Sequence, residues 1–172
     1  MKRILLSLCG TLFVTPCWAS GVQADDVPTL CKSYQVNVMS CEIVGPKKRI
    51  VSVCADSSDY GKSFDGVSYL FGNEREIELE YSADGGDLSR KFYRGTDSTT
   101  YTTYIAFKQS GYVYVVGVPE ERQGATAFVS VYRGSAKLKD MSCKTNSFGM
   151  KNIQSKQFVE VDGKDLALGK VK

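Results

Sequence analysis

The chain of 172 residues contains no histidine, and its single tryptophan is Trp18. Without histidine, neither Ser-His-Asp nor Cys-His catalysis is available, and histidine cannot act as a general acid or base. Zinc is usually held by histidine and closely spaced cysteines, and the chain has no Cys-x₂-Cys pair. Gly85-Gly86 is not followed by Lys-Ser or Lys-Thr, as a phosphate-binding loop requires. We therefore predict no catalytic residue, no cofactor and no metal ion.

Long apolar runs are also scarce, and the one clear run lies near the N-terminus. Residues 1–24 have the pattern of a secretory signal peptide: a Lys-Arg pair, an apolar run over 4–14, and small residues that fit cleavage after Ala19 or Ala24. That run is shorter than the ~20 residues needed to span a bilayer. We therefore predict a periplasmic or secreted protein with no transmembrane segment in the mature chain.

Net charge is low once the predicted signal is removed. Residues 1–24 carry two of the 22 basic residues and none of the 19 acidic ones, which leaves 20 basic and 19 acidic residues and a net charge of +1. Nucleic-acid-binding domains usually carry a strong basic footprint, so no nucleic-acid partner is expected. The remaining length suits one domain, and we predict a single β domain over 25–162 and a weakly ordered tail over 163–172.

Four cysteines remain after that removal, namely Cys31, Cys41, Cys54 and Cys143. An even number in an exported domain favours two disulfides, for which three pairings exist. A turn centred between residues 47 and 48 would place Cys41 opposite Cys54 in a hairpin, close enough for a bond. This argument predicts Cys41–Cys54, and therefore Cys31–Cys143.

Apolar and polar residues alternate along most of the chain, with many β-branched and aromatic residues, which is typical of strands. Glycine-containing turns predict hairpins at 72–74, 109–111 and 134–135. No sustained helical period occurs between residues 31 and 143. The pattern predicts an all-β fold, an antiparallel β-barrel or sandwich of about 7–9 disulfide-linked strands. The predicted strands are 34–44, 49–55, 67–71, 75–81, 102–108, 112–118, 125–133 and 136–141, with weaker candidates at 91–93 and 157–161.

Two clusters of charge are candidates for chemistry or binding. Glu76, Glu78 and Glu80 share one face of a predicted strand, about 6.6–7 Å apart, a separation that glycosidase carboxylates adopt. Such residues also commonly protect an exposed strand. Lys47-Lys48-Arg49 is the densest basic cluster, and at the tip of a hairpin it is a candidate contact for an anionic partner.

Tyrosine is abundant, with ten residues in the chain. Both faces of the predicted hairpin over 102–118 carry apolar or aromatic side chains, including Tyr104, Tyr112 and Tyr114. Tyrosine suits a core and also suits recognition, because it buries a large area and keeps a polar tip. Both interpretations remain open at this point.

One stretch resembles a group of small exported bacterial β-domain proteins of unassigned function. The similarity is carried by Cys41, by Arg49–Ala55 (RIVSVCA), by Tyr69–Gly72 (YLFG) and by Ile77–Tyr81 (IELEY). The resemblance implies a periplasmic β domain and no particular activity.

A second stretch, Ser110-Gly111-Tyr112-Val113-Tyr114, is similar to the S-G-x-x-Y pattern of the periplasmic C-type lysozyme inhibitors. Those proteins are small disulfide-linked β-barrels whose serine-containing loop enters the lysozyme cleft. The resemblance implies a partner-binding role for Ser110, Gly111, Tyr112 and Tyr114. Together with the basic pair Lys47 and Lys48, these are the predicted partner-binding residues.

We thus predict a non-catalytic periplasmic or secreted binding protein, of the inhibitor or immunity type, whose partner is another protein: a toxin, a cell-wall hydrolase or an envelope component. Contacts are expected from the loops 82–100, 109–111 and 119–124. Two alternatives remain, a glycan- or cell-wall-acting enzyme that uses carboxylates such as Glu76 or Glu78, and a structural envelope protein.

Overall fold

A computed structural model describes residues 27–57, 64–87, 89–120, 124–144 and 150–171. The predicted signal peptide, 1–24, lies outside these residues. Within the described ranges, no helix has the length and apolar character needed to cross a membrane.

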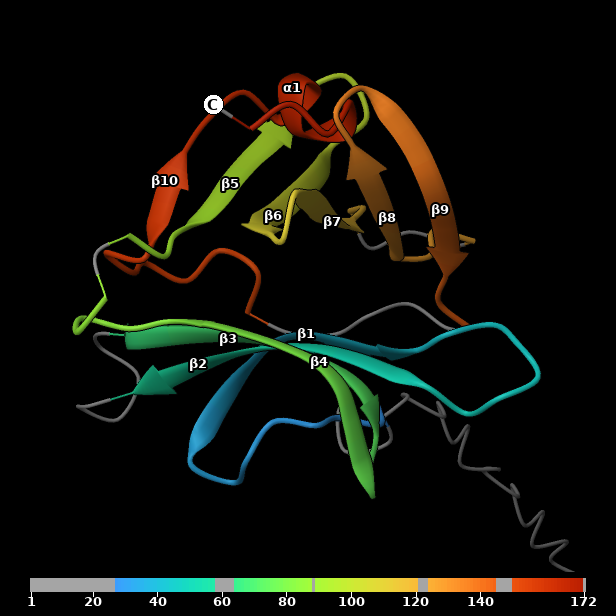
Figure 1. Cartoon of the computed structure of the whole chain (residues 1–172), viewed down its shortest axis with the longest axis vertical. Coiled ribbons are helices and arrows are strands. Elements are labelled where there is room, and N and C mark those ends of the chain that lie inside the picture. Colours follow the sequence, from blue (N-terminus) through green and yellow to red (C-terminus); the bar gives the residue numbers. More distant parts are fainter. Residues whose placement is uncertain (1–26, 58–63, 88, 121–123, 145–149, 172) are drawn as a thin grey trace, which may run out of the picture.

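The described residues form two β-sheets that face each other (Figure 1). The four-stranded sheet has the order β1-β2-β3-β4, with β1 (Gln35–Glu42), β2 (Ile50–Ser57), β3 (Phe64–Asn73) and β4 (Glu76–Ala83). The six-stranded sheet has the order β10-β5-β6-β7-β8-β9, with β5 (Phe92–Asp97), β6 (Thr102–Gln109), β7 (Tyr112–Val118), β8 (Phe128–Arg133), β9 (Ala136–Ser142) and β10 (Phe158–Glu160). Neighbouring strands are antiparallel except β10 and β5. The all-β prediction is confirmed, and because the sheets do not close on themselves the fold is a sandwich.

The core lies between the sheets and follows from the alternation of side chains along each strand. In β2, for example, Val51, Val53 and Ala55 are buried in this core. An aromatic cluster fills its centre, where Phe107 stacks on Tyr81 with ring centroids 4.4 Å apart. Close packing of this kind fixes the distance between the two sheets.

The outer face of the four-stranded sheet is covered by the segment before β1. The backbone N–H of Leu30 donates to the Ser52 hydroxyl, which is itself hydrogen-bonded to the hydroxyl of Ser40. Cys31 in the same segment is bonded to Cys54 on β2. Ser40 and Ser52, both buried on this face, therefore have partners, as buried polar groups require.

The outer face of the six-stranded sheet is covered by the short helix α1 (Gly163–Ala167), drawn at the top of Figure 1. Leu166 is 0% exposed, and the Tyr132 hydroxyl donates to the carbonyl of Ala167. Asp162 caps the helix by accepting from the N–H of Lys164. The prediction of a weakly ordered tail over 163–172 is therefore wrong for the described residues 163–171. The polar composition of this segment suggested a free end, but burial of Leu166 anchors it to the sheet.

The disulfides are Cys31–Cys54 and Cys41–Cys143, so the predicted pairing was wrong. The β1–β2 hairpin pairs Cys41 with Val51 and is centred on Pro46, not between residues 47 and 48. This shift of the register by an odd number of residues turns Cys41 and Cys54 to opposite faces of the sheet. Cys41 lies in the core beside Cys143, whereas Cys54 faces the segment before β1.

The β6–β7 hairpin confirms a predicted turn. Gln109 pairs with Tyr112, which leaves Ser110-Gly111 as a two-residue loop. Ser110 has φ 51° and Gly111 has φ 80°. Positive φ at both positions is the geometry of a type I′ turn, which matches the twist of the two strands.

Candidate binding groove

A groove opens between the two sheets on the side where β4 and β9 form the sheet edges. One part of it has a volume of about 480 Å³ and carries mostly aromatic and aliphatic side chains. Its lining residues are Tyr69, Phe71, Glu78, Leu79, Tyr112, Tyr114, Val131, Leu138, Lys139 and Met141. We call this part the aromatic half of the groove.

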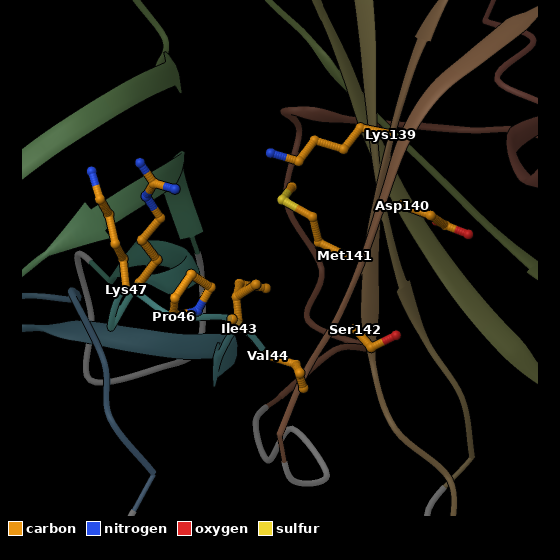
Figure 2. A pocket seen from close by; sticks show the side chains of 10 residues that line it. Ile43, Val44, Pro46, Lys47, Lys139, Asp140, Met141 and Ser142 are labelled. Carbon is orange, nitrogen blue, oxygen red and sulfur yellow. The ribbon is translucent and has the colours of Figure 1, made fainter.

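The other part lies between the β1–β2 loop and β9 and has a volume of about 540 Å³ (Figure 2). It is lined by Ile43, Val44, Gly45, Pro46, Lys47, Arg49, Lys139, Asp140, Met141 and Ser142. Lys139 and Met141 border both cavities, so the two cavities adjoin, and together we call them the inter-sheet groove. We call this second part the basic half.

The aromatic half continues the ring stacking of the core toward the surface. The ring of Phe107 stacks on that of Tyr114 at 4.9 Å, and Tyr114 lies 6.5 Å from Tyr112, which is partly exposed. Tyr69 contacts both Phe107 and Tyr114 from the opposite sheet. Burial raises the pKa of Tyr69 far above its ordinary value and, to a smaller extent, that of Tyr114. These phenols are therefore neutral hydrogen-bonding groups at physiological pH.

One ion pair spans the four-stranded sheet at the groove. Arg49 donates from Nε to the carboxylate of Glu78 over 2.7 Å, and this hydrogen bond raises the pKa of Arg49. The guanidinium also lies 5.7 Å from the ring centre of Phe71. The two charges compensate each other, so neither is available as an uncompensated contact for a ligand.

Lys47 and Lys139, by contrast, form no ion pair with any residue that the structure describes. Both are exposed and border the basic half. In Figure 2, Lys139 and Met141 extend from β9 toward the β1–β2 loop, while Asp140 points away. Asp140 is engaged by the Ser130 hydroxyl and by Lys137, so the groove holds two uncompensated positive charges.

The groove is closed at one end by contacts between β1 and β9. The N–H of Val44 donates to the carbonyl of Ser142, and the N–H of Lys144 donates to that of Glu42. The Cys41–Cys143 disulfide lies beside these bonds. Both β4 and β9 have a register irregularity, beside Gly72 in the β3–β4 pair and at Leu138 in the β8–β9 pair. Such bulges bend a strand and increase its local twist.

The predicted binding residues divide into two groups. Tyr112, Tyr114 and Lys47 line the groove. Ser110 and Gly111 form the β6–β7 turn and do not line it, and Lys48 instead forms an exposed ion pair with Glu74 at 3.5 Å. The structure therefore brings together three of the six residues.

Sequence reasoning missed the contribution of β9. Leu138 and Met141 are three residues apart and do not follow the alternation of a strand with one apolar face, and no local pattern tells which strand forms a sheet edge. The one available signal was Leu138, an apolar residue between two lysines that is 55% exposed in the structure. An exposed leucine on a sheet edge is a feature typical of contact surfaces when it adjoins other apolar residues.

The other predicted features are distributed differently. Of the three glutamates on β4, only Glu78 borders the groove, where it is bound to Arg49, so the groove does not bring two of these glutamates together. The predicted loop 82–100 contains β5, and part of the loop 119–124 lies outside the described residues. Within the described ranges, no group of three or more His, Cys, Asp or Glu side chains is arranged to hold a metal ion.

Comparison of the chain with protein-family models, with curated proteins and with solved structures finds no match. The functional interpretation therefore depends on the geometry and chemistry of the groove.

Proposed function

We propose that this chain is a non-catalytic binding protein that holds another protein in the inter-sheet groove. The observation that carries the proposal is the aromatic half of the groove, where Tyr112, Tyr114 and Leu138 form an apolar surface accessible between two sheet edges. The centres of protein interfaces are enriched in tyrosine, phenylalanine, methionine and arginine, and the groove contains all four types.

The rigidity of this surface also favours binding. The groove lies on strands, and the Cys41–Cys143 disulfide joins the two sheets at its closed end. A surface that is ordered before association loses little conformational entropy when a partner binds. The polar groups that border the groove include phenols, two lysines, the Arg49–Glu78 ion pair, and Asp140, which Ser130 and Lys137 already engage. Such a set suits recognition better than bond cleavage.

Two disulfides are typical of proteins that fold in an oxidising compartment, and with the signal-like residues 1–24 they support a periplasmic or secreted location. A small, disulfide-linked sandwich with a binding groove suits an inhibitor or immunity protein. Its partner would be a secreted toxin, a cell-wall hydrolase or an envelope component.

The test uses two leucines of equal exposure. Leu138 borders the groove and Leu168 lies beyond α1, and each is 55% exposed. Tagged wild-type protein, Leu138→Ser and Leu168→Ser would be used to capture partners from envelope and culture-supernatant fractions, and the partner recovered in stoichiometric amount would be purified. Its affinity for each variant would then be measured by calorimetry. We expect Leu138→Ser to weaken binding about tenfold or more and Leu168→Ser to leave it unchanged.

Two results would contradict the proposal. One is the absence of any stoichiometric protein partner from both fractions. The other is a partner that binds wild type and Leu138→Ser equally, with Tyr112→Ala also without effect, because the contact surface would then lie elsewhere.

A further inference from the structure

We propose that the partner enters the inter-sheet groove with an acidic, apolar chain segment, whose carboxylates meet Lys47 and Lys139 while its apolar side chains pack on Tyr112, Tyr114 and Leu138. This inference depends on the proposed function, and it names the chemistry that the groove selects.

The basic half carries positive charge that is not compensated within the described residues. Lys47 projects from the β1–β2 loop and Lys139 from β9, so the two ammonium groups approach the basic half from opposite walls (Figure 2). Neither has a carboxylate partner among the described residues, whereas both acidic groups that border the groove, Glu78 and Asp140, are engaged by Arg49 and Lys137. Complementary potentials set partner choice and orientation, and here they favour a negative partner.

The two halves of the groove adjoin each other. Lys139 and Met141 border both cavities, so a bound molecule that reaches the lysines also meets the aromatic surface. A ligand carrying charge alone would leave that surface uncovered. A polypeptide segment that alternates acidic and apolar residues satisfies both halves with one short stretch of chain.

The outer edge of β9 also offers backbone groups to a partner. The carbonyl of Ser142 accepts from Val44 on the side of β9 that faces away from β8. Backbone groups two residues apart in a strand point to the same edge, so those of Asp140 also face outward. Extended segments bind such edges through main-chain hydrogen bonds. Lysines on an edge discourage indiscriminate pairing, and the same charges would admit an acidic segment.

The experiment is a selection from a displayed library of random peptides against the oxidised, mature protein. Selected peptides would be synthesised and titrated against wild type, against Lys47→Glu/Lys139→Glu, and against Lys108→Glu/Lys170→Glu. The second pair is a matched control, because both lysines are exposed and neither borders the groove. Heparin and vesicles containing anionic phospholipid would be titrated in parallel.

We expect the selected peptides to be enriched in Asp and Glu alternating with Leu, Phe or Tyr. Their affinity should fall at least about tenfold in the groove pair and less than about twofold in the control pair. Raising the salt concentration should weaken binding to wild type, because exposed charges are screened.

Several results would overturn the inference. These are selected peptides without acidic enrichment, an equal loss in the two pairs, or failure to select any peptide. Binding of heparin or anionic vesicles that is lost only in the groove pair, without peptide binding, would assign the lysines to a polyanion or a lipid surface instead. The proposed function would still hold if a purified protein partner binds Leu138→Ser more weakly than Leu168→Ser. Failure of this inference can therefore be distinguished from failure of the proposed function.

Discussion

Cys41 of β1 is bonded to Cys143, the residue after β9, and this bond joins the two sheets at the closed end of the inter-sheet groove. The other disulfide, Cys31–Cys54, attaches the N-terminal segment to the outer face of the four-stranded sheet. The two bonds therefore have different roles. Cys41–Cys143 holds the two groove walls together, and Cys31–Cys54 holds the segment before β1 on the outer face of the four-stranded sheet.

Removing each disulfide should have an unequal cost. The Cys41–Cys143 loop spans 102 residues and the Cys31–Cys54 loop spans 23. Loop-closure entropy predicts losses in the free energy of unfolding of about 4–5 kcal/mol for Cys41→Ala/Cys143→Ala and about 3 kcal/mol for Cys31→Ala/Cys54→Ala. Urea unfolding of the two double variants gives the comparison. A larger loss from the shorter loop would show that contacts, and not chain entropy, dominate.

The helix α1 should contribute to stability although it is short. Leu166 is fully buried against the outer face of the six-stranded sheet, beside Tyr104, Val115 and Tyr132. Leu166→Ala should lower the free energy of unfolding by about 2–4 kcal/mol through lost burial and the cavity left behind. Leu168→Ala, which changes an exposed neighbour, should stay within about 0.5 kcal/mol of wild type. Equal effects of the two substitutions would mean that the segment after residue 162 is not docked in solution.

The β6–β7 turn offers a stabilising substitution. Ser110 adopts φ 51°, a left-handed conformation that is unfavourable for most residues but tolerated by asparagine. Ser110→Asn creates the Asn-Gly pair preferred in type I′ turns. It should raise the free energy of unfolding by about 0.5 kcal/mol, which a slightly higher melting temperature would report. Because Ser110 lies outside the groove, partner binding should not change. A loss of binding in this variant would instead support the role that the S-G-x-x-Y resemblance implies.

Stability should decrease at alkaline pH through Tyr69. Burial raises its pKa well above the value of about 10 found in an unfolded chain. Because the folded state disfavours the phenolate, the contribution of Tyr69 is fully present below about pH 10 and is lost as pH rises further. The slope for one proton is about 1.4 kcal/mol per pH unit.

Denaturant unfolding between neutral pH and the alkaline limit measures this effect. Tyr69→Phe should show a shallower alkaline decline than wild type, whereas Tyr101→Phe, which changes an exposed tyrosine, should decline as wild type does. Identical slopes for wild type and Tyr69→Phe would mean that the phenol is accessible to water in solution.

Much of the fold follows from local sequence. The alternation of apolar and polar residues predicted most of the strands, and the turn residues 110–111 predicted the β6–β7 hairpin. Both signals are local properties of the sequence. The cysteine pairing did not follow, because it depends on a register centred on Pro46, which hydrogen bonding and packing decide together. The helix α1 was missed for a similar reason: its single buried leucine is meaningful only when the sheet beneath it is present.

The candidate site was predictable only in part. Tyr112 and Tyr114 were predicted from the S-G-x-x-Y resemblance and the abundance of tyrosine, and Lys47 from the basic cluster, all of which are visible in a sequence. Leu138, Lys139 and Met141 required the three-dimensional structure, because they become a groove wall only where β9 lies across from β4 at the open side of the sandwich.

Site-specific photo-crosslinking in intact cells tests the groove as the protein-binding surface most directly. The photoreactive residue p-benzoyl-phenylalanine would replace Tyr112, which lines the groove, or Tyr34, which is 63% exposed and lies outside it. We expect one discrete crosslinked protein from position 112, absent from position 34 and abolished by Leu138→Ser. Crosslinking of the same protein from position 34 alone, or from both positions regardless of Leu138, would contradict it.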